Sequence, residues 1–144
     1  MADQNYSNHG RMVPMFHYVA FSAALFLFLL SIIHFIKTIG EGSGRLQAAG
    51  MLSMATAIIL ALWFARTFAL KAQDRAIRAE ENFRYYIATG KPLDSKLHMR
   101  QIIALRFAGD NEFVVLVKKA VDENLSAKQI KMAITNWKAD YNRV

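Results

Sequence analysis

The hydrophobic and polar positions divide the chain into an apolar N-terminal half and a C-terminal half where apolar residues recur at helical spacing. After a polar segment over residues 1–14, residues 15–36 form a run with only a few polar side chains. A second run, over residues 46–65, contains no ionisable side chain. Each run is long enough to cross a bilayer as a helix. Residues 37–45 contain three glycines and predict a short hairpin loop.

The second apolar run continues into a charged stretch with no proline to interrupt it. Arg66 is the first ionisable residue, good helix formers follow to Thr89, and Gly90 is a typical stop. One helix over residues 46–88 would be about 65 Å long, roughly twice the thickness of a hydrocarbon core. Residues 66–89 are therefore expected to extend the second span into water.

Residues 90–144 predict a small domain of three short helices. Asp94–Ser95 can cap the first helix and Asp110 the second, while Ser126 with Gln129 forms a capping box for the third. Apolar residues at helical spacing predict that the third helix continues to Tyr141. The expected fold is an all-α membrane protein: a two-span transmembrane hairpin, a second helix extended into the cytoplasm, and a helical C-terminal domain.

Small residues occupy every fourth position along the second span. Such rows let helix backbones approach closely in lipid. Two interpretations are open: the row packs the hairpin on itself, against Ala20, Ala24 and Ser31 of the first span, or it packs against another protomer. The candidate helix-packing residues are Ala49, Ser53, Ala57, Ala61 and Ala65.

Beyond the span, small and aromatic residues fall at alternating spacings of four and three. This stalk stripe consists of Ala72, Ala76, Ala79, Phe83 and Tyr86. The spacing is that of the a and d positions of a heptad. The stripe is expected either to receive the C-terminal domain, which we favour, or to form a parallel coiled coil with a second copy.

Charge sets the expected orientation. The formal net charge is +7, and residues 66–144 carry +6 of it. Basic residues near span ends mark the cytoplasmic side, so both termini are expected there. Four cations near the second span, Arg66, Lys71, Arg75 and Arg78, are candidates for contact with anionic lipid headgroups. Nucleic acid is disfavoured as a partner because the lysines of the C-terminal domain alternate with acids.

Little in the sequence indicates catalysis, a metal or a cofactor. The chain has no cysteine, which excludes disulfides, thiolate metal sites and a cysteine nucleophile. No P-loop, G-x-S-x-G or H-E-x-x-H motif occurs. His17 and His34 would lie about 25 Å apart on one helix and cannot share an ion. We therefore expect no enzyme activity, no cofactor and no metal.

The polar residues that precede the first span form an unusual group. They include Asn5, Tyr6, Asn8, His9, Arg11 and His17. Their simplest role is as an interfacial lead-in that meets lipid headgroups. The alternative is a patch that docks on the cytoplasmic domain or on a partner protein.

These N-terminal residues, in a QNYxNHxRxxPxxH-type pattern, and the segment AQDRAIRAEENFRYY over residues 72–86 carry a resemblance. The chain resembles a bacterial family of small two-span membrane proteins of unknown function, over nearly its whole length. The resemblance implies a location in the bacterial cytoplasmic (inner) membrane. It brings no activity, cofactor or partner.

The expected function is that of a non-enzymatic accessory, scaffold or regulatory membrane subunit, which self-associates or joins a larger membrane complex. One alternative is a holin-like or small-channel oligomeric pore, because two spans and a basic tail suit such proteins. A second alternative is a haem-bearing redox subunit, which would depend on His17 facing its copy in a dimer.

Overall fold

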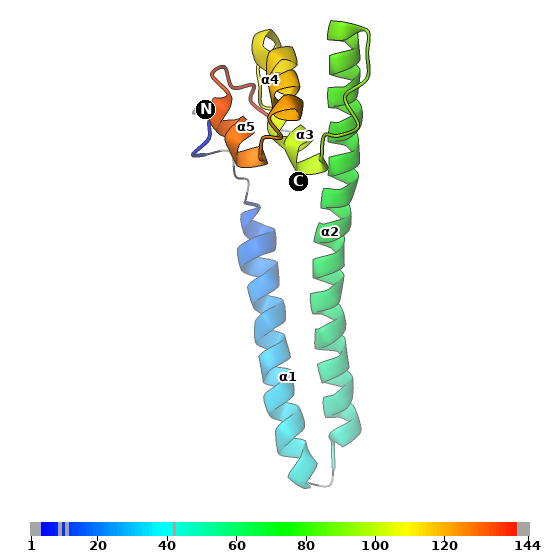
Figure 1. Ribbon diagram of the computed structural model, residues 1–144. Helices are drawn as coiled ribbons and strands as arrows, with labels where there is room; N and C mark the ends of the chain where they lie inside the picture. The colour runs from blue at the N-terminus through cyan, green and yellow to red at the C-terminus, as the bar shows by residue number, and fades with distance from the viewer. Residues whose placement is uncertain (1–3, 9, 11, 42, 141–144) are drawn as a thin grey trace. The chain divides into compact units, whose positions relative to one another are not determined.

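The computed structural model describes residues 4–8, 10, 12–41 and 43–140. A π-helical turn (Met15–Ala20) leads into α1 (Phe21–Glu41), which is followed by the long α2 (Arg45–Thr89). Three short helices complete the chain: α3 (Met99–Leu105), α4 (Asp110–Asp122) and α5 (Ala127–Ala133). Figure 1 shows these elements along the chain. The described residues are helical except for turns, loops and one isolated bridge between Ala108 and Trp137.

Two of the helices are long and apolar enough to cross a membrane. They cover Met15–Gly40 and Arg45–Thr89, and few of the residues in their most apolar windows are buried within the chain. The expected all-helical fold with two such segments is confirmed. α2 is one uninterrupted helix, as predicted, and it ends where Gly90 adopts a positive φ of 71°. A side chain at that φ would be strained, which explains the glycine.

The helical hairpin of residues 12–69 is closed by a turn between α1 and α2. Gly44 has a φ of +79° there, a backbone conformation that would strain a residue with a side chain. The Arg45 guanidinium donates a 2.7 Å hydrogen bond to the Ile39 carbonyl oxygen. This bond satisfies one of the carbonyl groups that the end of α1 would otherwise leave without a partner.

Small side chains spaced seven residues apart form the contact within the hairpin. On α1, Ala24, Ser31 and Thr38 are buried, and on α2 Ala48 and Ala55 are buried. The Ser31 and Thr38 hydroxyls donate hydrogen bonds to carbonyl oxygens of their own helix. Each hydroxyl is therefore satisfied without a partner on the facing helix.

The row of small residues predicted on α2 is not this contact. Ala49 is half-buried, whereas Ser53, Ala57, Ala61 and Ala65 are exposed. The reason is geometric: residues four apart advance by about 40° around a helix, whereas residues seven apart return to within about 20°. Only a spacing of seven stays on one partner over several turns. Packing of the row against another molecule remains a prediction.

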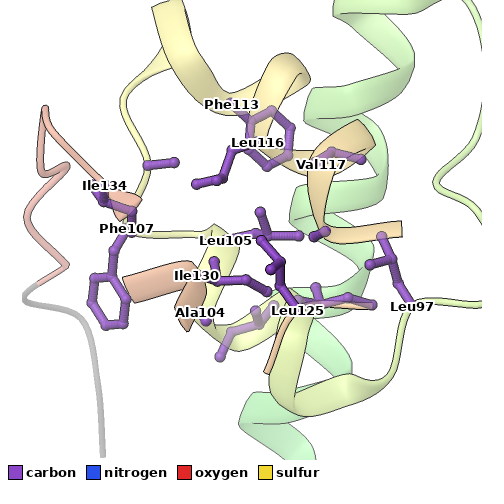
Figure 2. Close-up of a cluster of buried hydrophobic side chains, with 14 residues drawn as sticks. Leu97, Ala104, Leu105, Phe107, Phe113, Leu116, Val117, Leu125, Ile130 and Ile134 are labelled. Carbon is purple, nitrogen blue, oxygen red and sulfur yellow. The ribbon is translucent and has the colours of Figure 1, made fainter. Parts of the chain in front are cut away.

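The C-terminal domain is built around a hydrophobic core contributed by α3, α4 and α5. In Figure 2, Leu105 of α3 and Ile130 of α5 lie among side chains from α4, including Phe113 and Val117. All four are at most 2 % exposed. Ile77 of α2 completes this core, so the C-terminal domain shares one hydrophobic core with the charged half of α2, residues 66–89.

Of the N-caps predicted for the three short helices, the one at Ser126 is confirmed. The predicted capping box is present: the Ser126 N–H donates to Gln129 Oε1 at 2.8 Å, and the Gln129 N–H donates to Ser126 Oγ at 3.3 Å. α3 begins after His98 rather than at Asp94–Ser95. Asp110 is the first residue of α4 rather than its cap, which is Gly109, and the Asp110 carboxylate accepts a hydrogen bond from Arg84.

The third short helix ends earlier than predicted, at Ala133. Beyond it the chain runs back along residues 107–109, where the Gly109 N–H donates to the Asn136 carbonyl and the Lys138 N–H donates to the Phe107 carbonyl. The Trp137 ring packs against the Phe107 ring at a centroid distance of 5.2 Å. These contacts replace helical hydrogen bonds. Residues 134–140 therefore form an extended segment, the C-terminal strap, whose apolar side chains pack on the domain. Tyr141, the predicted helix end, lies outside the described residues.

Candidate functional site

The Arg84 side chain of α2 is the main polar link between this helix and the C-terminal domain. Its guanidinium donates to Asp110 Oδ1 at 2.8 Å, to the Ala108 carbonyl oxygen at 2.7 Å and to Glu81 Oε2 at 3.1 Å. The guanidinium carbon also lies 4.0 Å from the centre of the Phe113 ring. A planar cation with several donors suits this set of acceptors and an aromatic face.

A second contact fixes the chain that leads from α2 to α3. The Leu93 N–H donates to Asn82 Oδ1 at 2.8 Å, and the Tyr85 ring meets the Phe113 ring edge-on at 6.2 Å. The domain is thus held by one face of α2, which also contains the buried Ile77 and Glu81.

The stalk stripe does not receive the domain, contrary to the interpretation favoured from sequence. All five members, Ala72, Ala76, Ala79, Phe83 and Tyr86, are exposed. Phe83 is 64 % exposed and Tyr86 is 54 % exposed. The C-terminal domain instead contacts the side of α2 that contains Arg84 and Asn82. Polar residues such as these do not appear in a search for regularly spaced apolar positions. Pairing of the stripe with a second copy remains a prediction.

A polar pocket of about 440 Å³ lies beside this link, within the same unit of the chain. It is lined by residues of α2, by Arg106 and by the C-terminal strap: Gln73, Ala76, Ile77, Glu80, Glu81, Arg106, Lys138, Ala139 and Asp140. Arg106 Nη1 lies 3.2 Å from Asp140 Oδ2. The buried Gln4 accepts a hydrogen bond from the Asp140 N–H at 2.8 Å, which ties the N-terminal segment to the strap.

The carboxylates of the domain respond to these surroundings in opposite ways. Burial raises the pKa of the Glu81 carboxyl above its ordinary value, although Arg84 acts against the shift. The hydrogen bond and the positive charge of Arg84 lower the pKa of Asp110. Although burial acts to raise the pKa of Glu112, hydrogen bonds from Thr135 and Asn136 lower it overall. Glu112 thereby anchors the strap that follows α5.

The predicted N-terminal patch is only partly described. Asn5, Ser7 and Asn8 form a local turn, in which the Asn5 N–H donates to Asn8 Oδ1 at 2.6 Å and the Ser7 N–H donates to Asn5 Oδ1 at 2.9 Å. Tyr6 is exposed. His9 and Arg11 lie outside the described residues. Gln4, which begins the QNYxNHxRxxPxxH-type pattern, is buried, although an isolated polar residue near a terminus carries no periodic signal of burial.

The sixth residue of the patch, His17, belongs to the hairpin. Its Nδ1 lies 2.9 Å from the Val13 carbonyl oxygen and 3.1 Å from the Val13 nitrogen, so the ring is held against the backbone that precedes the π-helical turn. His17 also lines an apolar pocket of about 230 Å³ between the start of the first apolar helix and the middle of α2, together with Phe16, Phe21, Leu62, Trp63 and Arg66.

The four predicted lipid-contacting cations differ in their surroundings. Arg66 is half-buried at the rim of this aromatic pocket. Lys71, Arg75 and Arg78 are exposed on α2. Within the described ranges, no group of three or more His, Cys, Asp or Glu side chains is arranged to hold a metal ion.

The chain belongs to a family of unknown function (DUF6526), whose model matches residues 1–144. Searches of curated proteins and of solved structures found no match. The expectation of an uncharacterised family is thereby confirmed.

Replacing Arg84 should loosen the domain from α2. We expect Arg84→Ala to cost about 2–4 kcal/mol, because Glu81 stays buried without its cation and three hydrogen bonds are lost. Arg84→Lys should recover less than half of this, because one ammonium cannot reach all three acceptors. The measurement is urea unfolding of the full chain in detergent, followed by Trp137 fluorescence in a Trp63→Phe background.

The matched control for this series is Arg78→Ala, which removes the same side chain from an exposed position of α2. It should change stability by less than about 0.5 kcal/mol. Equal losses for Arg84→Ala and Arg78→Ala would contradict the role assigned to Arg84.

The raised pKa of Glu81 makes a pH-dependent prediction. A carboxyl whose folded pKa lies above its ordinary value of 4.5 favours folding below that value, and this contribution is lost as the pH rises through the folded pKa. The stability of Glu81→Gln relative to the unsubstituted chain should therefore increase between pH 4 and pH 7. Urea midpoints at several pH values measure it. Glu80→Gln, at the exposed neighbouring position, controls for net charge, and an equal trend in both variants would refute the assignment.

Proposed function

We propose that this protein is a membrane-embedded accessory or scaffold subunit that presents its C-terminal domain on the cytoplasmic side of a bacterial inner membrane. The observation that carries the proposal is the surface of the hairpin. Its exposed side chains are large and apolar on both helices, among them Phe26, Leu30, Ile33, Met54 and Leu60. Large exposed apolar surfaces mark contacts with a membrane or a partner, and lipid is the solvent that suits a surface of this composition.

The distribution of charge supports the same orientation. Residues 46–65 of α2 carry no ionisable side chain, and cations begin at Arg66. Lys71, Arg75 and Arg78 follow at exposed positions. An excess of cations close to a span favours retention on the cytoplasmic side, and the two spans then place both termini there.

The scaffold part of the proposal includes self-association through the stalk stripe. Phe83 and Tyr86 project from α2 without burial in the domain. Their heptad spacing suits a parallel pair of α2 helices, in which a and d residues of both copies meet. A dimer formed in this way would display two copies of the C-terminal domain from one membrane anchor.

Single-cysteine labelling tests the orientation, and the chain is suited to it because it contains no cysteine of its own. Ser43→Cys in the hairpin loop should react with a membrane-impermeant maleimide added to intact bacterial spheroplasts. Lys128→Cys in the domain should react only after lysis. Labelling of Lys128→Cys in intact spheroplasts, or loss of the protein from carbonate-washed membranes, would refute the proposal.

Disulfide cross-linking tests the self-association. In a parallel pair, Ala72→Cys and Phe83→Cys each face their own copy and should give covalent dimers when isolated membranes are oxidised. Ala88→Cys is also exposed but lies about 160° around α2 from the stripe, and should stay monomeric. Equal dimer yields at all three positions would indicate random collision rather than a defined interface.

A further inference from the structure

The pocket between the start of the first apolar helix and the middle of α2 combines an apolar lining with a cation. Phe16 and Phe21 come from the first apolar helix, whereas Leu62 and Trp63 come from α2. The polar members are His17, whose Nδ1 is held against the backbone of Val13, and Arg66. We propose that this pocket binds one anionic glycerophospholipid, with the start of an acyl chain among the aromatic rings and the phosphate on Arg66.

The size of the pocket favours part of a lipid over a separate small molecule. Its volume is about 230 Å³, below the range of roughly 300–1,000 Å³ that is typical of sites for whole drug-sized ligands. A lipid needs only one segment of its chain to be enclosed, because the remainder stays in the bilayer. The pocket therefore suits a molecule that is already anchored beside the hairpin.

The position of Arg66 supplies the charge complementarity. It is the first ionisable residue after the apolar run of α2, so in a bilayer it lies where the hydrocarbon gives way to headgroups. Phosphate oxygens are preferred acceptors for a guanidinium, which can donate two parallel hydrogen bonds to them. Arg66 is half-buried at the pocket rim, unlike the exposed Lys71 further along the helix. This inference rests on the membrane location proposed above.

Quenching of Trp63 by brominated lipid tests the inference directly, because Trp63 lines the pocket. The full chain with Trp137→Phe is reconstituted in vesicles of phosphatidylcholine and phosphatidylglycerol, with bromine on the chains of one lipid at a time. The relative association constant at Trp63 should favour phosphatidylglycerol about fivefold, the factor that one surface cation contributes toward anionic lipid.

Two variants separate the pocket from general surface charge. Arg66→Gln should bring the preference to about one, because the phosphate loses its partner. Lys128→Gln removes one positive charge from an exposed position of the C-terminal domain, outside the pocket lining, and should keep the preference. No preference in the unsubstituted chain, or equal loss in both variants, would overturn the lipid site while leaving the membrane location intact. An absence of quenching by either lipid would overturn both proposals.

Discussion

The guanidinium of Arg84 determines which face of α2 the C-terminal domain occupies. Its acceptors come from the turn before α4, from the first residue of α4 and from α2 itself. A domain of about fifty residues has only a marginal core by itself, and Ile77 of α2 adds to that core. Because Arg84 orients the domain over Ile77, the polar contact and the hydrophobic burial depend on each other.

The elements of this chain were largely predictable from sequence, whereas their contacts were not. Long apolar runs and an uninterrupted helix are properties of consecutive residues, so both apolar helices and the full length of α2 follow from the pattern. The Ser126–Gln129 box is equally local. By contrast, one arginine among several on α2 gives no sign that its acceptors lie 24 and 26 residues away.

Two predicted packing faces show how small differences in spacing redirect helix contacts. A row at intervals of four winds around α2 and leaves the facing helix after two turns, so Ala48 and Ala55 make the hairpin contact instead of Ser53 and Ala57. In the charged half of α2, residues 66–89, the stalk stripe has the correct period for packing against a long partner helix. The domain offers α2 only short helices and a turn, and three short segments cannot follow a heptad seam. The face of α2 that the domain occupies is therefore the one whose polar side chains, Arg84 and Asn82, find hydrogen-bond partners in the domain.

The same reasoning indicates where this protein has surface left for recognition. Among the described residues, the buried charged side chains are Glu81 and Arg106, and both pair with neighbours in their own domain. Charges that hold a fold together are poorly placed to bind a partner, because breaking their pairs would leave a buried charge uncompensated. The exposed stalk stripe on α2 and the aromatic pocket with Arg66 contain no such buried ion pair. A helix surface that keeps a heptad over five positions without contacting its own domain is most simply explained by a partner that is itself a long helix.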